Sequence, residues 1–248
     1  MVNTDRTWQR WGEQDPYYGV KNELKFTKAE LPKHIDEFFA AGEEYVERSL
    51  TQARMAFGDF RRNRALDFGC GVGRLLLPFA KRFGTVTGMD ISEAMLAEAR
   101  NNALAASISN IEFVKSDDSL SQAADLYDLV NTYIVLQHIP VRRGMAILER
   151  LLELVASGGC AIIHLSIDRR FSFTQSMKYF GKNFVPGIRQ IGNVLRGRDI
   201  NRPTMQMNEY NLVRVLEMFQ EHGFDPVLVF LEDHGGVVTG KLISKKSR

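Results

Sequence analysis

One stretch, residues 64–90, constrains the fold of this chain more than any other. A short apolar run that ends at Phe68 is followed by glycines at alternate positions and then, from Arg74 to Gly84, by apolar residues at helical spacing. Glycines allow the sharp turns and close backbone approaches that a bound ligand requires. A β-branched run then ends on Asp90, where a carboxylate accepts hydrogen bonds from a ribose diol. The stretch therefore predicts a strand, a glycine turn, a helix and a second strand.

The glycine turn carries an acid that a dinucleotide site does not need. Asp67 stands two residues before the first of the glycines, which are Gly69, Gly71 and Gly73. Its carboxylate repels a pyrophosphate but suits a cationic ligand. With this acid-x-Gly-x-Gly-x-Gly motif the chain resembles the class I S-adenosylmethionine-dependent methyltransferases. An ordinary nucleotide-binding βαβ unit is the alternative interpretation.

Strands and helices alternate along most of the chain. Further strands are predicted at 111–114, 127–133 and 160–167, an amphipathic helix at 142–156 and a Ser-Gly-Gly helix end at 157–159. A last helix at 208–222 precedes a hairpin of strands at 224–231 and 237–244. We expect an α/β fold with a Rossmann-like seven-stranded, mostly parallel sheet and helices on both faces. The expected parts are an N-terminal helical lid (1–60), the cofactor-binding core (61–167), an inserted basic and aromatic cap (168–207), and the final helix and hairpin of the core (208–248).

The resemblance implies S-adenosylmethionine as cofactor and S-adenosylhomocysteine as product. Asp67 and the glycine turn, with Cys70, would then face the methionyl part of the donor. Asp90 would hold the ribose, and Ile91 would pack on adenine. Asp117 would accept from the adenine amino group and Asp118 would supply a backbone amide; the alternative interpretation of the two acids is a solvated turn. The residues that complete this cofactor set are Tyr133 and Gln137.

His138, just past the fourth strand, is our candidate base for a hydroxyl acceptor, since an imidazole titrates near neutral pH. The alternative is a histidine that only packs within its loop. His164 lies in an apolar strand and is interpreted as a core residue. The candidate acceptor contacts are Tyr17, Tyr18, Asp168, Arg169 and His234. Because the histidines, cysteines and acids show no metal-ligand spacing, we predict an enzyme that needs no metal.

Two segments leave more than one interpretation open. The aromatic residues before position 20 either dock the N-terminal segment onto the body of the protein or form a lid over the cofactor. Between Asp168 and Asn208 the chain has eight lysines and arginines against two aspartates, interleaved with aromatic residues. This segment is interpreted as a solvated face, as a cap that recognises an anionic or lipid-linked acceptor or touches a membrane surface, or as an oligomer interface.

Bulk composition excludes little. The formal net charge of +2 gives no reason to expect a nucleic acid partner. The two cysteines form no disulfide framework, and neither a signal-peptide core nor a membrane-spanning run is visible, so we expect a cytoplasmic protein. The function expected first is methyl transfer to a hydroxyl of a small molecule, such as a sugar or another polyhydroxylated metabolite in free, lipid-linked or phosphate-linked form. The alternatives are methylation of a small amine, and a regulatory or scaffold protein that binds S-adenosylmethionine without catalysis.

Overall fold

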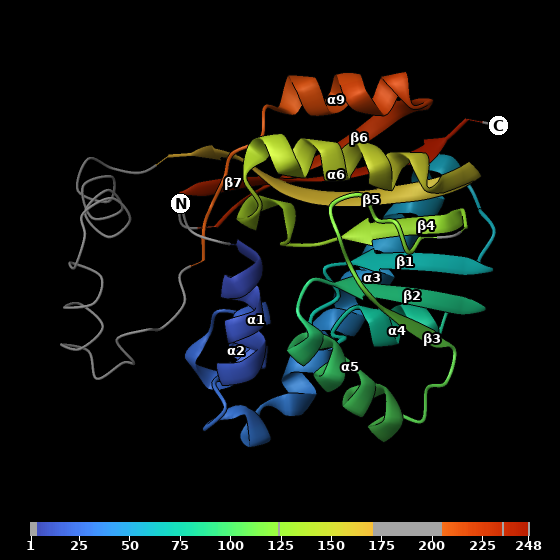
Figure 1. Ribbon diagram of the computed structural model, residues 1–248. Coiled ribbons are helices and arrows are strands. Elements are labelled where there is room, and N and C mark those ends of the chain that lie inside the picture. Colours follow the sequence, from blue (N-terminus) through green and yellow to red (C-terminus); the bar gives the residue numbers. More distant parts are fainter. Residues whose placement is uncertain (1–3, 124, 171–204, 235, 248) are drawn as a thin grey trace.

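The computed structural model describes residues 4–123, 125–170, 205–234 and 236–247. Seven strands form one sheet in the order β3-β2-β1-β4-β5-β7-β6 (Figure 1). The strands are β1 (Arg64–Phe68), β2 (Thr85–Asp90), β3 (Ile111–Lys115), β4 (Tyr127–Thr132), β5 (Val155–Arg169), β6 (Phe224–Asp233) and β7 (Val237–Lys246). The helices are α1 (Thr4–Gln14), α2 (Pro16–Val20), η1 (Leu24–Phe26), η2 (Leu31–Lys33), α3 (Ile35–Phe57), α4 (Leu76–Ala80), α5 (Glu93–Ala105), η3 (Leu136–His138), α6 (Val141–Glu153) and α9 (Leu212–Glu221).

Strands β1 to β5 run parallel, and β7 is inserted antiparallel between β5 and β6. The predicted Rossmann-like, mostly parallel sheet of seven strands is therefore confirmed. The strand order reverses at β1, which lies between β2 and β4. In open α/β sheets, ligands bind at such a switch point, beyond the carboxyl ends of the strands. The sheet thus locates a binding site before any side chain is considered.

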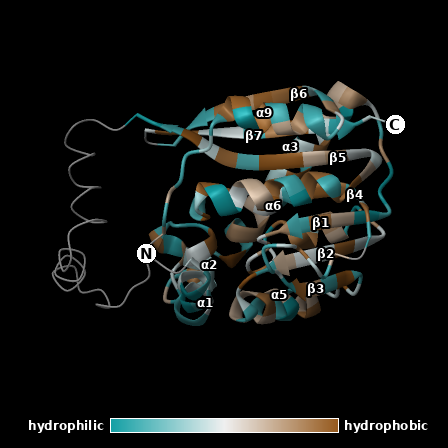
Figure 2. Ribbon diagram, turned by 45° about the horizontal axis from the view of Figure 1, so that its top comes forward, coloured by the Kyte–Doolittle hydropathy of each residue, from teal (hydrophilic) through white to brown (hydrophobic). Residues whose placement is uncertain are grey.

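Two hydrophobic layers hold the helices against the sheet. On one face α3, α4 and α5 pack on the strands through residues such as Val46, Leu76 and Leu96. On the other face α6 and α9 bury Leu148 and Phe219. The buried residues of α6 recur every three or four positions, as the amphipathic pattern of its sequence predicts. Figure 2 shows the central strands as largely hydrophobic and α1 as largely hydrophilic.

The helices α1 and α2 lie beside the sheet rather than on either of its faces (Figure 1). They share a separate aromatic cluster with α3 and α5 that includes Trp11, Tyr18, Phe38 and Met95. α1 approaches α5 closely at Gly12, where an added Cβ would lie 2.6 Å from the Ser92 hydroxyl. A larger residue at this position would push α1 away from the end of the sheet.

Three local expectations were wrong in their bounds. The helix expected from Arg74 to Gly84 is reduced to the five residues of α4, because tight turns occupy both of its flanks. The Ser-Gly-Gly stretch at 157–159 lies inside β5, where the pairing with β4 jumps from Tyr127–Val155 to Leu129–Cys160. β5 also extends to Arg169, two residues further than expected. Most of the expected insertion at 168–207 lies outside the described residues.

Within the part of the chain that the structure describes, the helices include none with the length and apolar character needed to cross a bilayer.

Candidate functional site

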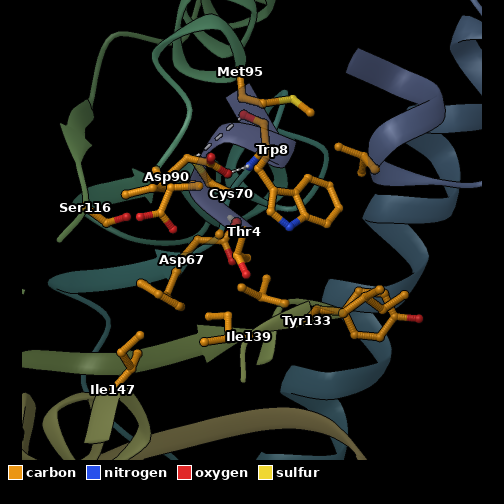
Figure 3. A pocket seen from close by; sticks show the side chains of 18 of the residues that line it. Thr4, Trp8, Asp67, Cys70, Asp90, Met95, Ser116, Tyr133, Ile139 and Ile147 are labelled. Carbon is orange, nitrogen blue, oxygen red and sulfur yellow. Dashed lines mark hydrogen bonds between the residues drawn. The ribbon is translucent and has the colours of Figure 1, made fainter. Parts of the chain in front are cut away.

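A pocket opens at the carboxyl ends of the central strands, where the sheet topology places it. Its wall combines the glycine turn, the ends of β2, β3 and β4, and residues of α1 and α2 (Figure 3). In Figure 3, Asp90 and Ser116 lie toward one end of the pocket, Tyr133 lies toward the other, and the indole of Trp8 reaches between them. The residues of the wall that the sequence had singled out are Asp67, Gly69, Cys70, Gly71, Asp90, Ile91, Asp117, Asp118 and Tyr133. Gly73 and Gln137 are outside this wall.

The glycine turn is tight because its first amides return to β2. The N–H groups of Gly69 and Cys70 both donate to the carbonyl of Met89, at 2.7 and 3.0 Å. Gly69 has φ +72°, and an added Cβ would lie 2.2 Å from Cγ2 of Val135. A side chain at Gly69 would therefore strain the backbone and collide with the loop after β4.

Asp90 is buried at the mouth of this turn. Its Oδ2 accepts from the Gly71 N–H and its Oδ1 from the Ser92 N–H, both at 2.9 Å. Burial raises the pKa of Asp90 to about 6, although these backbone donors oppose the shift. Ser92 also begins α5, since its hydroxyl accepts from the Met95 N–H, as serine does at the start of many helices. One carboxylate thus joins the glycine turn to the start of the next helix while it faces the pocket.

Asp67 lies at the end of β1 and is almost fully buried. Asn131, its neighbour in β4, donates from Nδ2 to Asp67 Oδ1 at 2.7 Å. Burial nevertheless raises the pKa of Asp67 to about 7, against the opposing effects of Asn131 and the positive charge of Arg74. A polar Asn131 within the apolar run of β4 was the only sign of this partner in the sequence, and the sequence analysis missed it.

Asp117 and Asp118 have different roles in the loop after β3. The carboxylate of Asp117 accepts from Ser121 N and from the hydroxyls of Ser119 and Ser121, which holds its pKa at about 2. Asp118 instead pairs with Arg143. The Nε of Arg143 lies 2.7 Å from each carboxylate oxygen of Asp118, and its Nη2 lies 2.5 Å from Oδ1.

Arg143 also donates from Nη1 to Asp5 of α1 at 2.6 Å. The arginine of α6 therefore links α1 to the loop after β3, across the same pocket that all three residues line. Because the partners are 25 and 138 positions apart in the chain, no local pattern predicted this link. It fastens α1 over the end of the pocket where Asp117 and Asp118 lie.

His138 contacts the wall of the pocket without belonging to it. Its ring centroid lies 5.0 Å from that of Trp8, and its Nδ1 lies 2.6 Å from the carbonyl oxygen of Gln206. Since a carbonyl only accepts, Nδ1 carries the proton and Nε2 keeps its lone pair. Burial lowers the pKa of His138 to about 4, below the near-neutral value on which its choice as a base rested, so the imidazole is neutral at physiological pH.

His164 is a buried strand residue, as expected from its apolar surroundings. Its ring packs on Tyr133 with centroids 4.7 Å apart, and burial lowers its pKa to about 3. Neither ring nitrogen has a hydrogen-bond partner among the described residues. From β5, this histidine thus supports the ring of Tyr133, which belongs to the pocket wall.

The candidate acceptor contacts are not brought together at the pocket. Tyr17 donates to Glu98 and Asn102 of α5, at 2.9 Å each, and so anchors α2. Tyr18 packs on Trp11 with ring centroids 5.6 Å apart. All five candidates are absent from the pocket wall formed by the described residues: Tyr17, Tyr18, Asp168, Arg169 and His234.

The last three of these candidates lie at the ends of β5 and β6. Arg169 pairs with Glu209, Asp168 faces Arg170 at 3.5 Å, and His234 lies 3.3 Å from Glu232. In the structure, each of these three side chains therefore contacts a charged side chain outside the pocket wall. Among the described residues, histidines, cysteines and acids form no group of three or more that is arranged to hold a metal ion.

Comparison with known proteins supports the fold. Residues 65–159 match a family model described as a methyltransferase domain. The chain is 31% identical over 105 residues, 42% of its length, to a 23S rRNA (uracil(1939)-C(5))-methyltransferase of Marinomonas posidonica, but it spans only 23% of that relative. It is 26% identical over 182 residues, 73% of each chain, to a magnesium-protoporphyrin O-methyltransferase of Synechocystis.

A solved structure of a magnesium protoporphyrin IX methyltransferase from Synechocystis, with bound S-adenosylmethionine, superposes with a TM-score of 0.64. The alignment covers 100% of this chain and 99% of that one, at 17% identity, and so supports the fold. By the family match, residues 65–159 are a methyltransferase domain, and the chain shares the fold of the solved methyltransferase that binds S-adenosylmethionine.

Proposed function

We propose that this protein transfers the methyl group of S-adenosylmethionine to a hydroxyl oxygen of a small molecule. The observation that carries the proposal is the pocket itself, in which two buried acids and the glycine turn face one space at the carboxyl edge of the sheet. Oxygen as the acceptor atom is favoured by the Synechocystis relative, an O-methyltransferase that aligns over 73% of each chain. The rRNA methyltransferase aligns over a smaller share of both chains.

In this proposal the donor lies along the pocket with its adenosine toward Asp90 and its methionyl part toward Tyr133. Asp90 accepts from the ribose hydroxyls, Ile91 packs on the base, and the loop at Asp117 and Asp118 faces the adenine edge. Asp67 receives the ammonium group of the methionyl part, directly or through water. Methyl transfer from a sulfonium is an in-line displacement, so the protein mainly aligns the two reactants and excludes water.

The helices α1 and α2 act as the lid of this site, because Thr4, Asp5 and Trp8 cover the pocket and Val20 touches the glycine turn. Residues 168–207 form the cap that selects the acceptor, and their excess of six positive charges suits an anionic or phosphate-linked metabolite. The helices of the lid join the site from outside the sheet.

His138 is the proposed base for the acceptor hydroxyl. Its support is the tautomer, since the Gln206 carbonyl holds the proton on Nδ1 and leaves Nε2 free to accept one. His138→Gln should lower kcat by about 10²- to 10⁴-fold and leave the donor affinity unchanged. A variant that keeps wild-type kcat would remove the histidine from the mechanism without affecting the proposed reaction.

The decisive experiment supplies donor labelled on the methyl group to purified protein and cell extract. The extract is then separated into lipid, polysaccharide, nucleic acid, protein and small-metabolite fractions. We expect label in the small-metabolite, polysaccharide or lipid fraction, as an ether stable to mild base, and none with Asp90→Ala. Label on a basic nitrogen would show an amine methyltransferase, and label in nucleic acid or protein would overturn the proposal. Tight donor binding with no labelled fraction would favour a non-catalytic role.

A further inference from the structure

Arg74 is a buried cation in the wall of the pocket, and it has no anionic partner among the described residues. It follows the glycine turn directly, and only 6% of its surface is exposed. Within the described residues it forms no salt bridge, and its Nε has no hydrogen-bond partner. Asp67, a nearby acid that acts on its charge, is instead bound by Asn131. A guanidinium in this state is unusual, because burial of an unpaired charge is strongly unfavourable.

The side chain is held in place by aromatic rings and by a close helix contact. Its guanidinium carbon lies 5.5 Å from the ring centroid of Tyr133 and 5.9 Å from that of Phe38. Gly42 of α3 packs on the arginine so tightly that an added Cβ would lie 2.2 Å from the Arg74 carbonyl oxygen and 2.9 Å from its Cγ. α3 and the loop after β4 thus fix Arg74 before any ligand arrives.

The position of Arg74 within the pocket indicates which anion it receives. Asp90 and Ser116 lie toward one end of the pocket, whereas Tyr133, which Arg74 covers, lies toward the other (Figure 3). In the proposed orientation of the donor, the Tyr133 end receives the methionyl part. The α-carboxylate is the one anionic group of S-adenosylmethionine, and a guanidinium binds a carboxylate through paired N–H donors.

We propose that Arg74 binds the α-carboxylate of the donor, so that Asp67 and Arg74 together recognise the amino acid zwitterion. This inference rests on the proposed use of S-adenosylmethionine and names the residue that selects the amino acid part of the donor. The cation–π contacts with Tyr133 and Phe38 hold the charge in the free protein, and the carboxylate replaces the missing partner on binding. Arg74 then acts in donor binding and positioning rather than in proton transfer.

The test compares two ligands that differ in the amino acid part. S-adenosylhomocysteine carries it, whereas 5′-methylthioadenosine retains adenosine and sulfur but lacks it. By titration calorimetry, Arg74→Gln should weaken S-adenosylhomocysteine by about 10- to 100-fold and change 5′-methylthioadenosine by less than about threefold. Arg74→Lys should fall between wild type and Arg74→Gln for S-adenosylhomocysteine, because it keeps the charge but loses the paired geometry.

Arg143→Gln is the matched control, since this arginine lines the same pocket but already pairs with two aspartates. It should weaken both ligands to a similar extent. Equal losses of both ligands in Arg74→Gln would assign Arg74 a purely structural role and overturn the inference. Unchanged affinity for S-adenosylhomocysteine in Arg74→Gln would overturn it as well.

A second measurement needs no variant and so does not depend on the folding of Arg74→Gln. Wild-type protein should bind the decarboxylated donor about 10- to 100-fold more weakly than S-adenosylmethionine. Equal affinity for the two donors would refute the assignment. If wild-type protein binds neither S-adenosylhomocysteine nor S-adenosylmethionine, the proposed function itself fails, which is a different result from an unaltered preference in the variant.

Discussion

Protonation of Asp67 should control the affinity for the donor near neutral pH. Burial raises the pKa of this carboxyl to about 7 in the free protein, so about half of it is ionised at pH 7 and about one hundredth at pH 5. If the ammonium group of the ligand requires the carboxylate, the contribution of Asp67 to the affinity falls by about 50-fold over this range. An α-amino group has a pKa of about 7.7–8.0 in model peptides, so the ligand's own amine stays mostly protonated up to pH 7.

Titration calorimetry with S-adenosylhomocysteine at pH 5, 6 and 7 measures this effect in wild type and in Asp67→Asn. The amide resembles the protonated acid, so the advantage of wild type over the variant should shrink as the pH falls, by up to about 50-fold. Asp90, with a pKa of about 6, titrates in the same range and its charge acts on Asp67, so the Asp67→Asn profile measures the contribution of Asp90 without that interaction.

A second variant gives the direction of the shift. Asn131 donates to Asp67 and opposes the rise in its pKa, so Asn131→Leu should move the midpoint of the pH dependence above that of wild type. Parallel pH profiles for wild type and Asp67→Asn would refute the reasoning, because they would show that the ionisation of Asp67 does not contribute to binding. A midpoint that moves down in Asn131→Leu would refute the account of the pKa.

Three further changes test the lid, the loop that carries the candidate base, and the glycine turn. Asp5→Asn removes one of the two carboxylates that hold Arg143, and stopped-flow release of donor should be about two- to fivefold faster at low salt, with no difference at high salt. Tyr210→Phe leaves two buried carbonyls of the loop around η3 without their hydroxyl donor, and urea titration should show a loss of about 1–3 kcal/mol in the free energy of unfolding. Gly69→Ala should reduce donor affinity at least tenfold by a clash with the loop after β4, as measured by calorimetry, whereas Gly58→Ala, with φ +71° and open space around it, should bind donor normally. Unchanged release, stability or affinity, respectively, would contradict each expectation.

The sequence predicted the fold well because its signals are local. The glycine turn, the acid that ends β2 and the alternation of apolar runs each depend on neighbouring residues, and a parallel sheet places strand ends at one edge. Asp67 and Asp90 therefore fall where the motif predicts, whereas the order of the strands was not predicted. The cap that Ser92 provides for α5 is equally local, since its hydroxyl accepts from an amide three residues later.

The interactions that complete the pocket depend on contacts between distant parts of the chain, and these were missed. Arg143 binds Asp5, which lies 138 positions earlier. The position of Arg74 depends on its close contact with Gly42, which belongs to a helix that precedes all the strands of the sheet. Tyr17 was proposed for the acceptor because it is aromatic and N-terminal, but its hydroxyl is bound by α5, 81 and 85 positions away. A motif reports residue types, whereas these roles depend on which surfaces meet after folding.

The charges buried at this edge of the sheet also explain why donor binding and stability should be coupled. Asp67 and Asp90 are buried at the cost of raised pKa values, and Arg74 is buried without an anionic partner among the described residues. Each of these groups faces a pocket whose proposed ligand brings the complementary group: an ammonium, a ribose diol and a carboxylate. The free protein therefore holds an unfavourable arrangement that the donor relieves. Part of the binding free energy arises from this relief, so residues that weaken the donor site need not weaken the fold, and some of their substitutions should stabilise the free protein.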